Sequence, residues 1–231
     1  MIVLRGVVPE EVYSHFLTFC VAMSLLLHPD YKVISYYLNY AQELLKTFVS
    51  SAPKIYGPTF TVYNVHSLLH LHEDVEHFRC SLNEISAFPF ENYLQTLKKY
   101  VRNSSKPLVQ VVKRLTEAEE SNMHKKNKKI ATHIGYNIKD GCFVLHDSSV
   151  AFVKQSIDED TFSSDVISAA HIKSLFTNPC DSKLLNIGFI TSRYSHVREK
   201  LLPRSQLVHK AACLPCDGGY AVIPLLHGSE H

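Results

Sequence analysis

The sequence predicts an α+β protein, with an N-terminal helical domain followed by a small β-rich, barrel-like domain. In the first half of the 231 residues, apolar side chains recur at helical spacing. After about residue 134, short β-branched runs alternate with glycine and aspartate, as in strands joined by turns. With 45% hydrophobic and 20% charged residues, the chain can bury a core, so lasting disorder is excluded.

The helical half is expected to contain four helices and a continuation of the fourth. A proline and two glutamates at residues 9–11 suit the first turn of the first helix. Pro53, Gly57 and Pro58 predict a loop over residues 50–58. The inner face of the third helix is assigned to Val65, Leu68, Leu69, His72 and Val75. The helical stretches are predicted over residues 12–27, 31–49, 63–78, 88–102 and 108–120.

The β-rich half is expected to form a small barrel or sheet. Strand-like runs cover residues 142–146, 150–157, 165–172, 184–190, 206–214 and 220–226. Asp217, Gly218 and Gly219 predict a tight turn that joins the last two runs in a hairpin. Between the halves, residues 122–133 are polar and rich in basic and amide side chains. We therefore predict a helical domain over 1–125, a basic linker over 126–134 and a β-rich domain over 135–231.

Charge and cysteine content narrow the functional classes. A formal net charge of +2 does not force binding of nucleic acid, although a local basic patch could still provide it. Six scattered cysteines are too few for a disulfide scaffold and indicate an intracellular protein, nuclear or cytoplasmic. The N-terminus does not have the form of a signal peptide, and no apolar run is long enough to predict a membrane span. Its abrupt apolar start suggests the tail of a longer protein.

Four histidines, at positions 66, 70, 72 and 77, lie within twelve residues. His66 and His70 are four residues apart and share a helix face, a spacing that can chelate zinc. In the zinc protease signature a second histidine follows His-Glu after two residues, whereas this sequence has Glu76 at that position and His77 one place later. We therefore expect His66 and His70 to point partly into the helical core and to hold no metal.

The cysteines raise two further hypotheses, a C-x-x-C site and a cysteine nucleophile. The pair Cys213 and Cys216, as C-x-x-C, could be half of a zinc site with His209 and His227, a redox pair, or part of a plain hairpin, and the hairpin is favoured. No local signature supports a cysteine nucleophile. The sequence also has no glycine-rich phosphate loop, no nucleophile elbow and no dinucleotide fingerprint.

The predicted helix at 88–102 carries the most informative pattern. Pro89 and Glu91 suit its first turn, and Phe90, Leu94, Leu97 and Val101 form an apolar stripe that we expect to be buried. Four basic residues crowd its C-terminal end: Lys98, Lys99, Arg102 and Lys106. They either complement the helix dipole or form a strip that follows nucleic-acid phosphates.

Residues 65–75 and 88–103 together resemble the C-terminal part of CACTA-type (En/Spm-like) transposases, including the domain of unknown function that follows the transposase core. The first stretch matches the form V-H-x-L-x-H-L-x-x-x-V, and the second matches [Y/F]-P-F-E-x-x-[L/M]-x-x-L-K-x-x-V-R-N. The resemblance spans roughly residues 10–120, and Lys106-Pro107-Leu108 continues it as in invertebrate relatives. The β-rich tail is similar to an extension of those relatives.

The resemblance implies an RNase H-like core in which two aspartates and a glutamate hold divalent metals. Glu91 is the position that would carry the remnant third acid. The only aspartate before the histidine cluster is Asp30, in a helix-breaking segment, so the acidic triad is incomplete. We therefore expect a truncated or domesticated fragment that is not an enzyme and has no cofactor, with Mg²⁺ relevant only if an intact core were supplied elsewhere.

DNA is the expected partner, through the four basic residues of the 88–106 region. The alternative is a protein-interaction module that binds other proteins through the β-rich tail and no nucleic acid. A metal-dependent hydrolase built on the histidine cluster is the weakest of the three hypotheses. Neither of the first two involves a membrane.

Overall fold

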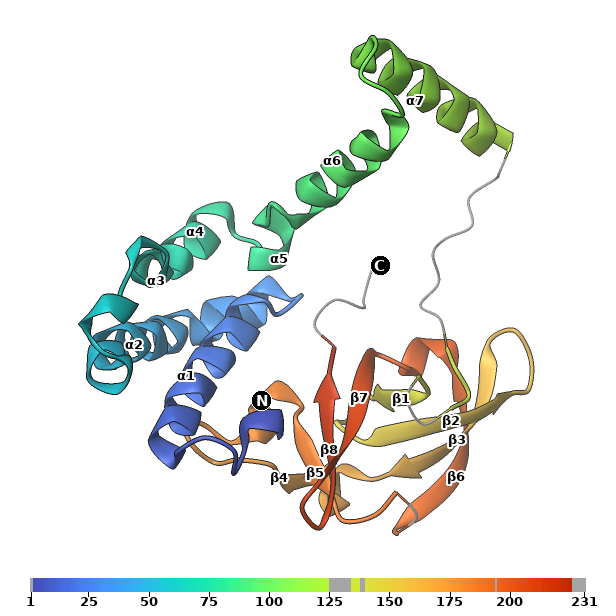
Figure 1. Cartoon of the computed structure of the whole chain (residues 1–231). Coiled ribbons are helices and arrows are strands. Elements are labelled where there is room, and N and C mark those ends of the chain that lie inside the picture. Colours follow the sequence, from blue (N-terminus) through green and yellow to red (C-terminus); the bar gives the residue numbers. More distant parts are fainter. Residues whose placement is uncertain (1, 125–133, 138–139, 194, 226–231) are drawn as a thin grey trace. The chain divides into compact units, whose positions relative to one another are not determined.

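The computed structural model describes residues 2–124, 134–137, 140–193 and 195–225. Contacts divide the chain into two compact units. The larger unit joins Met1–Leu82 with Thr132–His231, and the smaller is Asn83–Ala131. The predicted α+β class is confirmed, because helices precede a curled sheet of eight strands (Figure 1).

Helices occupy the described chain up to residue 124. The α-helices are α1 (Glu10–Leu26), α2 (Tyr31–Tyr56), α3 (Tyr63–His66), α4 (Leu71–Phe78), α5 (Leu82–Ile85), α6 (Phe88–Tyr100) and α7 (Pro107–His124). Short 3₁₀ turns lie at η1 (Ile2–Leu4), η2 (Pro58–Phe60), η3 (Ser67–His70), η4 (Ala169–His171), η5 (Ser182–Leu185) and η6 (Arg204–Gln206). None of the described helices is both long and apolar enough to cross a bilayer.

Helices α1 and α2 pack against each other and form the helical core. Val21, Leu26, Ile34 and Leu45 are almost fully buried there, and Val75 from α4 joins them. At the start of α2, the Asp30 carboxylate accepts a hydrogen bond from the Lys32 amide at 2.9 Å, which caps the helix. The core thus follows the apolar periodicity of the sequence.

The predicted loop at residues 50–58 is wrong over its first part, because α2 continues through Pro53 to Tyr56. Pro53 lies in the last turn, and packing supports that turn: Ala52 is fully buried, and the Tyr56 ring packs on Phe60 at 4.4 Å between centroids. Proline removes one backbone donor, and tertiary contacts offset that loss here. Gly57, at φ 90°, then ends the helix.

The third predicted helix, 63–78, is divided into α3, the 3₁₀ turn η3 and α4. Within this stretch, the Ser67 hydroxyl donates to the Asn64 carbonyl at 2.9 Å. Such a local side-chain bond competes with regular α-helical pairing and favours a tighter turn. His72 and Val75, which follow the turn, are buried as the predicted inner face requires, and Leu68 packs against the core.

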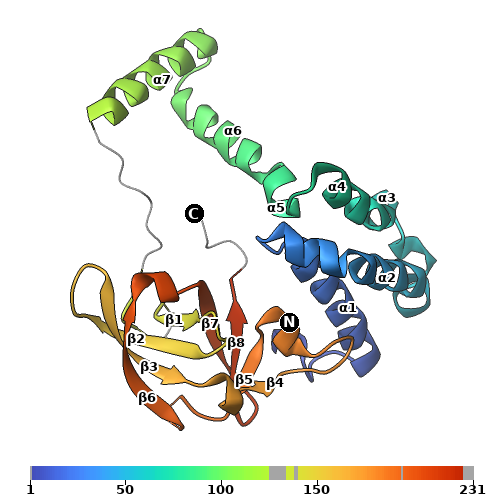
Figure 2. The same ribbon diagram turned by 180° about the vertical axis from the view of Figure 1, so that it is seen from behind.

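The sheet has the order β4-β5-β8-β7-β1-β2-β3-β6, and all neighbouring pairs are antiparallel. Figure 2 shows from behind how it curls. The cysteine-bearing hairpin β7–β8 turns at Asp217 and Gly218, as predicted, and Gly218 adopts φ 76°. The strands are β1 (Cys142–Val144), β2 (Val150–Ser156), β3 (Thr161–Ile167), β4 (Lys173–Ser174), β5 (Gly188–Ile190), β6 (Val197–Pro203), β7 (His209–Cys216) and β8 (Gly219–Pro224).

Sequence reasoning missed β6, an edge strand paired with β3. Its centre is Arg198, Glu199 and Lys200, all exposed, so it lacks the apolar alternation of a half-buried strand. Charged side chains are common on edge strands because they discourage pairing with another chain. The predicted strand at 165–172 is also partly wrong, since its second half contains the 3₁₀ turn η4.

The larger unit is held together by contacts between its helices and the segment that leads to β5. The Tyr40 hydroxyl donates to the Pro179 carbonyl at 2.9 Å, and Phe176 and Leu185 pack against the helical core. The change from helices to strands lies where the sequence predicts it. The compact units nevertheless follow other boundaries than the predicted domains 1–125 and 135–231, whose independent folding stays a prediction.

Candidate functional site

The candidate nucleic-acid interface is the corner between α6 and α7 in the smaller unit. Pro89 lies in the first turn of α6 together with Glu91, and Lys98 and Lys99 lie in its last turn. The Val101 amide donates to the Lys98 carbonyl at 3.2 Å and ends the helix. Local sequence therefore builds α6 as predicted, with an acid at its start and bases at its end.

The turn of residues 101–106 is organised by one side chain, Gln110. Its Oε1 accepts from the Arg102 amide at 2.9 Å, while its Nε2 donates to Asn103 Oδ1 at 2.8 Å and to the Ser105 carbonyl at 2.6 Å. Lys106 adopts φ 49°, and its carbonyl accepts from the Gln110 amide at 3.3 Å. These bonds fix the direction in which the chain enters α7.

The structure places all four predicted basic residues on this corner. Lys98, Lys99, Arg102 and Lys106 are exposed, and none forms an ion pair with an acid among the described residues. Sequence reasoning missed Lys113, which is exposed on α7. Lys113 follows Lys106 by seven residues, about two turns of a helix, and this spacing could have predicted that it extends the basic group. Arg114 lies beside it but contacts Glu117 at 3.6 Å.

The apolar stripe predicted for α6 is only partly covered. Phe90 and Leu94 are 74% and 56% exposed, and Leu97 and Val101 are half-buried. Helix α7 meets α6 near the turn, so it leaves the N-terminal half of the stripe open within this unit. The expectation of a fully buried stripe was therefore wrong.

Glu91, the predicted remnant of a catalytic triad, is exposed in the first turn of α6. No group of three histidine, cysteine, aspartate or glutamate side chains with metal-binding geometry occurs in the part of the chain that the structure describes. The position of Glu91 in the first turn suits a structural role, since a carboxylate there complements the helix dipole, and its catalytic role stays a prediction.

The histidine cluster is arranged differently from the expectation. His66 and His70 are exposed, with ring centroids 5.8 Å apart, so the prediction that they point into the core was wrong. His70 Nδ1 lies 3.2 Å from the Glu73 carboxylate. His72 is the buried one, and its Nε2 accepts from the Gln42 amide nitrogen at 2.6 Å. The burial of His72 and Val75 agrees with the inner face predicted for this stretch, so only the expectation for His66 and His70 is overturned.

In the larger unit, Cys213 and Cys216 lie on β7, three residues apart and hence on opposite faces of the strand. Cys213 instead lies beside Cys142 of β1, which is fully buried and donates a hydrogen bond to it. Accepting this hydrogen bond lowers the pKa of the Cys213 thiol, and the positive charge of the nearby Arg193 lowers it further. Donating the same hydrogen bond, together with burial, raises the pKa of the Cys142 thiol. None of the six cysteines, all of which lie in the described part of the chain, forms a disulfide. His227, the fourth candidate zinc ligand, lies outside the described residues.

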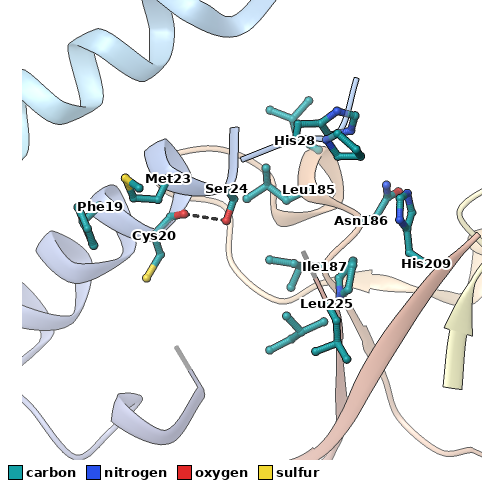
Figure 3. Close-up of a pocket in the computed structure, with 14 residues that line it drawn as sticks. Phe19, Cys20, Met23, Ser24, His28, Leu185, Asn186, Ile187, His209 and Leu225 are labelled. Atoms are coloured by element: carbon teal, nitrogen blue, oxygen red, sulfur yellow. Dashed lines mark hydrogen bonds between the residues drawn. The ribbon is translucent and has the colours of Figure 1, made fainter. Parts of the chain in front are cut away.

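A cavity of about 340 Å³ lies in the larger unit between α1, η5 and the ends of β7 and β8 (Figure 3). Phe19, Met23, Leu185 and Ile187 give it an apolar wall, and Asn186 and His209 contribute polar side chains to its lining. Burial raises the pKa of the lining Cys20 thiol, which keeps it protonated. Cys20 is thus unsuited to act as a nucleophile.

Comparison of the chain with protein-family models, with curated proteins and with solved structures finds no match.

Proposed function

We propose that this chain is a non-catalytic, transposable-element-derived protein that binds the phosphate backbone of DNA through the α6–α7 corner, inside the cell, in the nucleus or the cytoplasm. The resemblance of residues 10–120 to CACTA-type transposases supports its origin. The observation that carries the binding function is the group of four exposed basic side chains around one ordered turn, free of described ion pairs.

The positions of these charges favour binding over a purely structural role. Lys98 and Lys99 complement the dipole at the C-terminus of α6, which explains them without any ligand. Lys106, however, directly precedes α7, and the first turn of α7 contains no acid. A cation at a helix N-terminus opposes the dipole, at a cost of about 0.3–1 kcal/mol. A phosphate group at the turn would compensate both Lys106 and the positive helix end.

The test is the salt dependence of binding to duplex DNA. If about three or four phosphates are neutralised, the logarithm of the association constant should fall with the logarithm of salt concentration with a slope of roughly −3. Replacing Lys98 and Arg102 together by glutamine should flatten that slope by nearly two units, with little dependence on DNA sequence.

The matched control replaces Lys32 and Lys54 by glutamine. Both are exposed on α2 and lack described ion pairs, so the two double variants lose the same charge. The control should keep the wild-type slope. Equal slopes in all three proteins, or no binding at low salt, would refute the proposal and favour a protein-interaction module, for which the exposed Phe90 and Leu94 offer an apolar contact surface.

A further inference from the structure

Arg193 follows β5 in the larger unit, and its guanidinium group is held in one position by a single aromatic residue. Its Nη2 donates to the Tyr220 hydroxyl at 3.1 Å, and its Cζ lies 4.3 Å from the centre of the Tyr220 ring. Tyr220 lies on β8, where it pairs with Ile190 of β5. The arginine is therefore anchored to the sheet by a hydrogen bond and a cation–π contact.

The same guanidinium group has an unused donor. Arg193 Nε is buried and has no hydrogen-bond partner among the residues that the structure describes. Buried donors are almost always paired in folded proteins, because an unpaired one loses its bond to water without replacement, at about 1–3 kcal/mol. A ligand atom that accepts a hydrogen bond from this unpaired N–H would offset that cost.

No described acid supplies that acceptor. Asp165, which lines the same cavity as Arg193, instead forms an ion pair with Lys154 at 2.6 Å, and Lys154 also lies 3.9 Å from Glu199. Arg193 has no ion-pair partner among the residues that the structure describes. Its positive charge is thus left without a carboxylate at a partly buried position.

A cavity of about 220 Å³ lies beside this charge. Besides Arg193, its lining includes Tyr136, Asn137, Phe152, Lys154 and Asp165. Two aromatic side chains, an amide, two cationic residues and one carboxylate, that of Asp165, surround this space. Because Asp165 is paired with Lys154, the charge left over is that of Arg193, which suits a small molecule with one negatively charged group. Guanidinium groups bind carboxylates and phosphates through two parallel N–H donors, a geometry that the unused Nε makes available.

We propose that this cavity is a binding site for a small oxyanion, whose carboxylate or phosphate oxygen accepts a hydrogen bond from Arg193 Nε. The site is separate from the α6–α7 corner. The cavity has room for a ligand group the size of a small metabolite. The aromatic walls favour a ligand whose body is planar or apolar.

The experiment follows the Arg193 Nε–H signal in two-dimensional ¹H–¹⁵N spectra of the full chain, assigned by its absence in Arg193→Gln. Inorganic phosphate, acetate and benzoate are the probes, with chloride at equal ionic strength as the reference. Phosphate and acetate distinguish the two oxyanion types, and benzoate tests the aromatic walls. We expect saturable movement of this signal with at least one probe, at a dissociation constant of the order of 1 mM.

Thermal unfolding provides the second readout. The bound probe should raise the unfolding midpoint of the wild type relative to chloride, because it binds the folded state alone. Arg193→Gln should weaken binding at least about tenfold, whereas Arg198→Gln, which removes an exposed arginine of β6, should not.

If Arg193→Gln fails to fold, Tyr220→Phe replaces it, because this change keeps the charge and removes only the hydroxyl anchor. Tyr220→Phe should weaken binding several-fold. An Arg193 Nε–H signal that stays unmoved by all three probes, or that moves equally with chloride, overturns the proposal. So does an affinity that Arg193→Gln and Arg198→Gln reduce equally.

Discussion

At the scale of single residues, neighbouring elements decide which member of a repeated residue type is buried. His15 is 5% exposed, and its Nε2 donates to the Phe48 carbonyl at 2.8 Å, while its ring stacks on Phe48 at 4.2 Å. His72 is buried against Gln42, whereas His66 and His70 remain exposed. Helical spacing correctly placed His72 on the inner face, but it did not predict the burial of His15 or the exposure of His66 and His70.

The Cys142–Cys213 pair gives a prediction at this scale. The Cys142 thiol donates to Cys213, and the Arg193 charge acts in the same direction, so the pKa of Cys213 is lowered. A thiol with a lowered pKa is deprotonated at a lower pH, and the thiolate is the reactive form. Iodoacetamide should therefore label Cys213 with a midpoint at lower pH than it labels Cys180, whose pKa is raised by burial.

Cys142→Ala removes the donor and should shift the labelling midpoint of Cys213 to higher pH. Mass spectrometry of the labelled peptides, over a pH series, measures both midpoints. Cys180→Ala is the matched control, since it removes a thiol elsewhere in the larger unit. A Cys213 midpoint that Cys142→Ala leaves in place would contradict the assigned hydrogen bond.

At the scale of elements, two side chains determine how helices end and turn. The Tyr56 ring contacts Phe60 and His15, and these contacts stabilise the last turn of α2 beyond Pro53. Gln110 bonds to three residues of the α6–α7 turn. Neither effect is visible in the local propensity of the residues concerned, because each depends on a contact outside the segment itself.

Replacing Gln110 by alanine should loosen this turn without removing any charge. If the corner binds DNA, its affinity should fall a few-fold, because the basic side chains must be ordered on binding, whereas the salt slope should stay unchanged. Fluorescence anisotropy with a labelled duplex over a salt series measures both quantities. Gln95→Ala, on the exposed side of α6, is the control. A changed slope in Gln110→Ala would indicate that the turn does more than orient the cations.

At the scale of the whole molecule, residues distant in sequence form one compact unit. Helices α1 and α2 pack against Phe176 and Leu185, and Tyr40 bonds to the Pro179 carbonyl. These contacts join the first 82 residues to the β-rich region, although the residues of the smaller unit separate the two in the sequence. Removal of apolar surface from water, at about 25 cal/mol per Å², is the main stabilising contribution of such packing.

Limited trypsin digestion tests this arrangement. The polar, lysine-rich segment at residues 122–129 should be cut early, as its sequence predicts. The two fragments should then elute together in gel filtration, because α1 and α2 still contact the β-rich fragment. Replacing Phe176 and Leu185 together by alanine should lower the urea concentration at which the fragments separate. Leu184→Ala, at a neighbouring residue that is 39% exposed, should have little effect. Fragments that separate without denaturant would instead support the domains predicted from sequence.

The sequence by itself determined the α+β class, the positions of α1, α6 and most strands, and the β7–β8 turn. These follow from local periodicity, from first-turn residues such as Pro89 and Glu91, and from Gly218, which adopts a positive φ. It also located the basic group at Lys98 to Lys106, because charge and exposure go together on a helix end.

Only the tertiary structure decided the rest. It determined that His15 is buried while His66 and His70 are exposed, how α2 passes Pro53, that the charged β6 forms an edge strand, and that Cys142 meets Cys213. It also joined Arg193 to Tyr220 beside a cavity. Each of these depends on residues brought together from distant parts of the chain, and local propensity and spacing contain no information about such contacts.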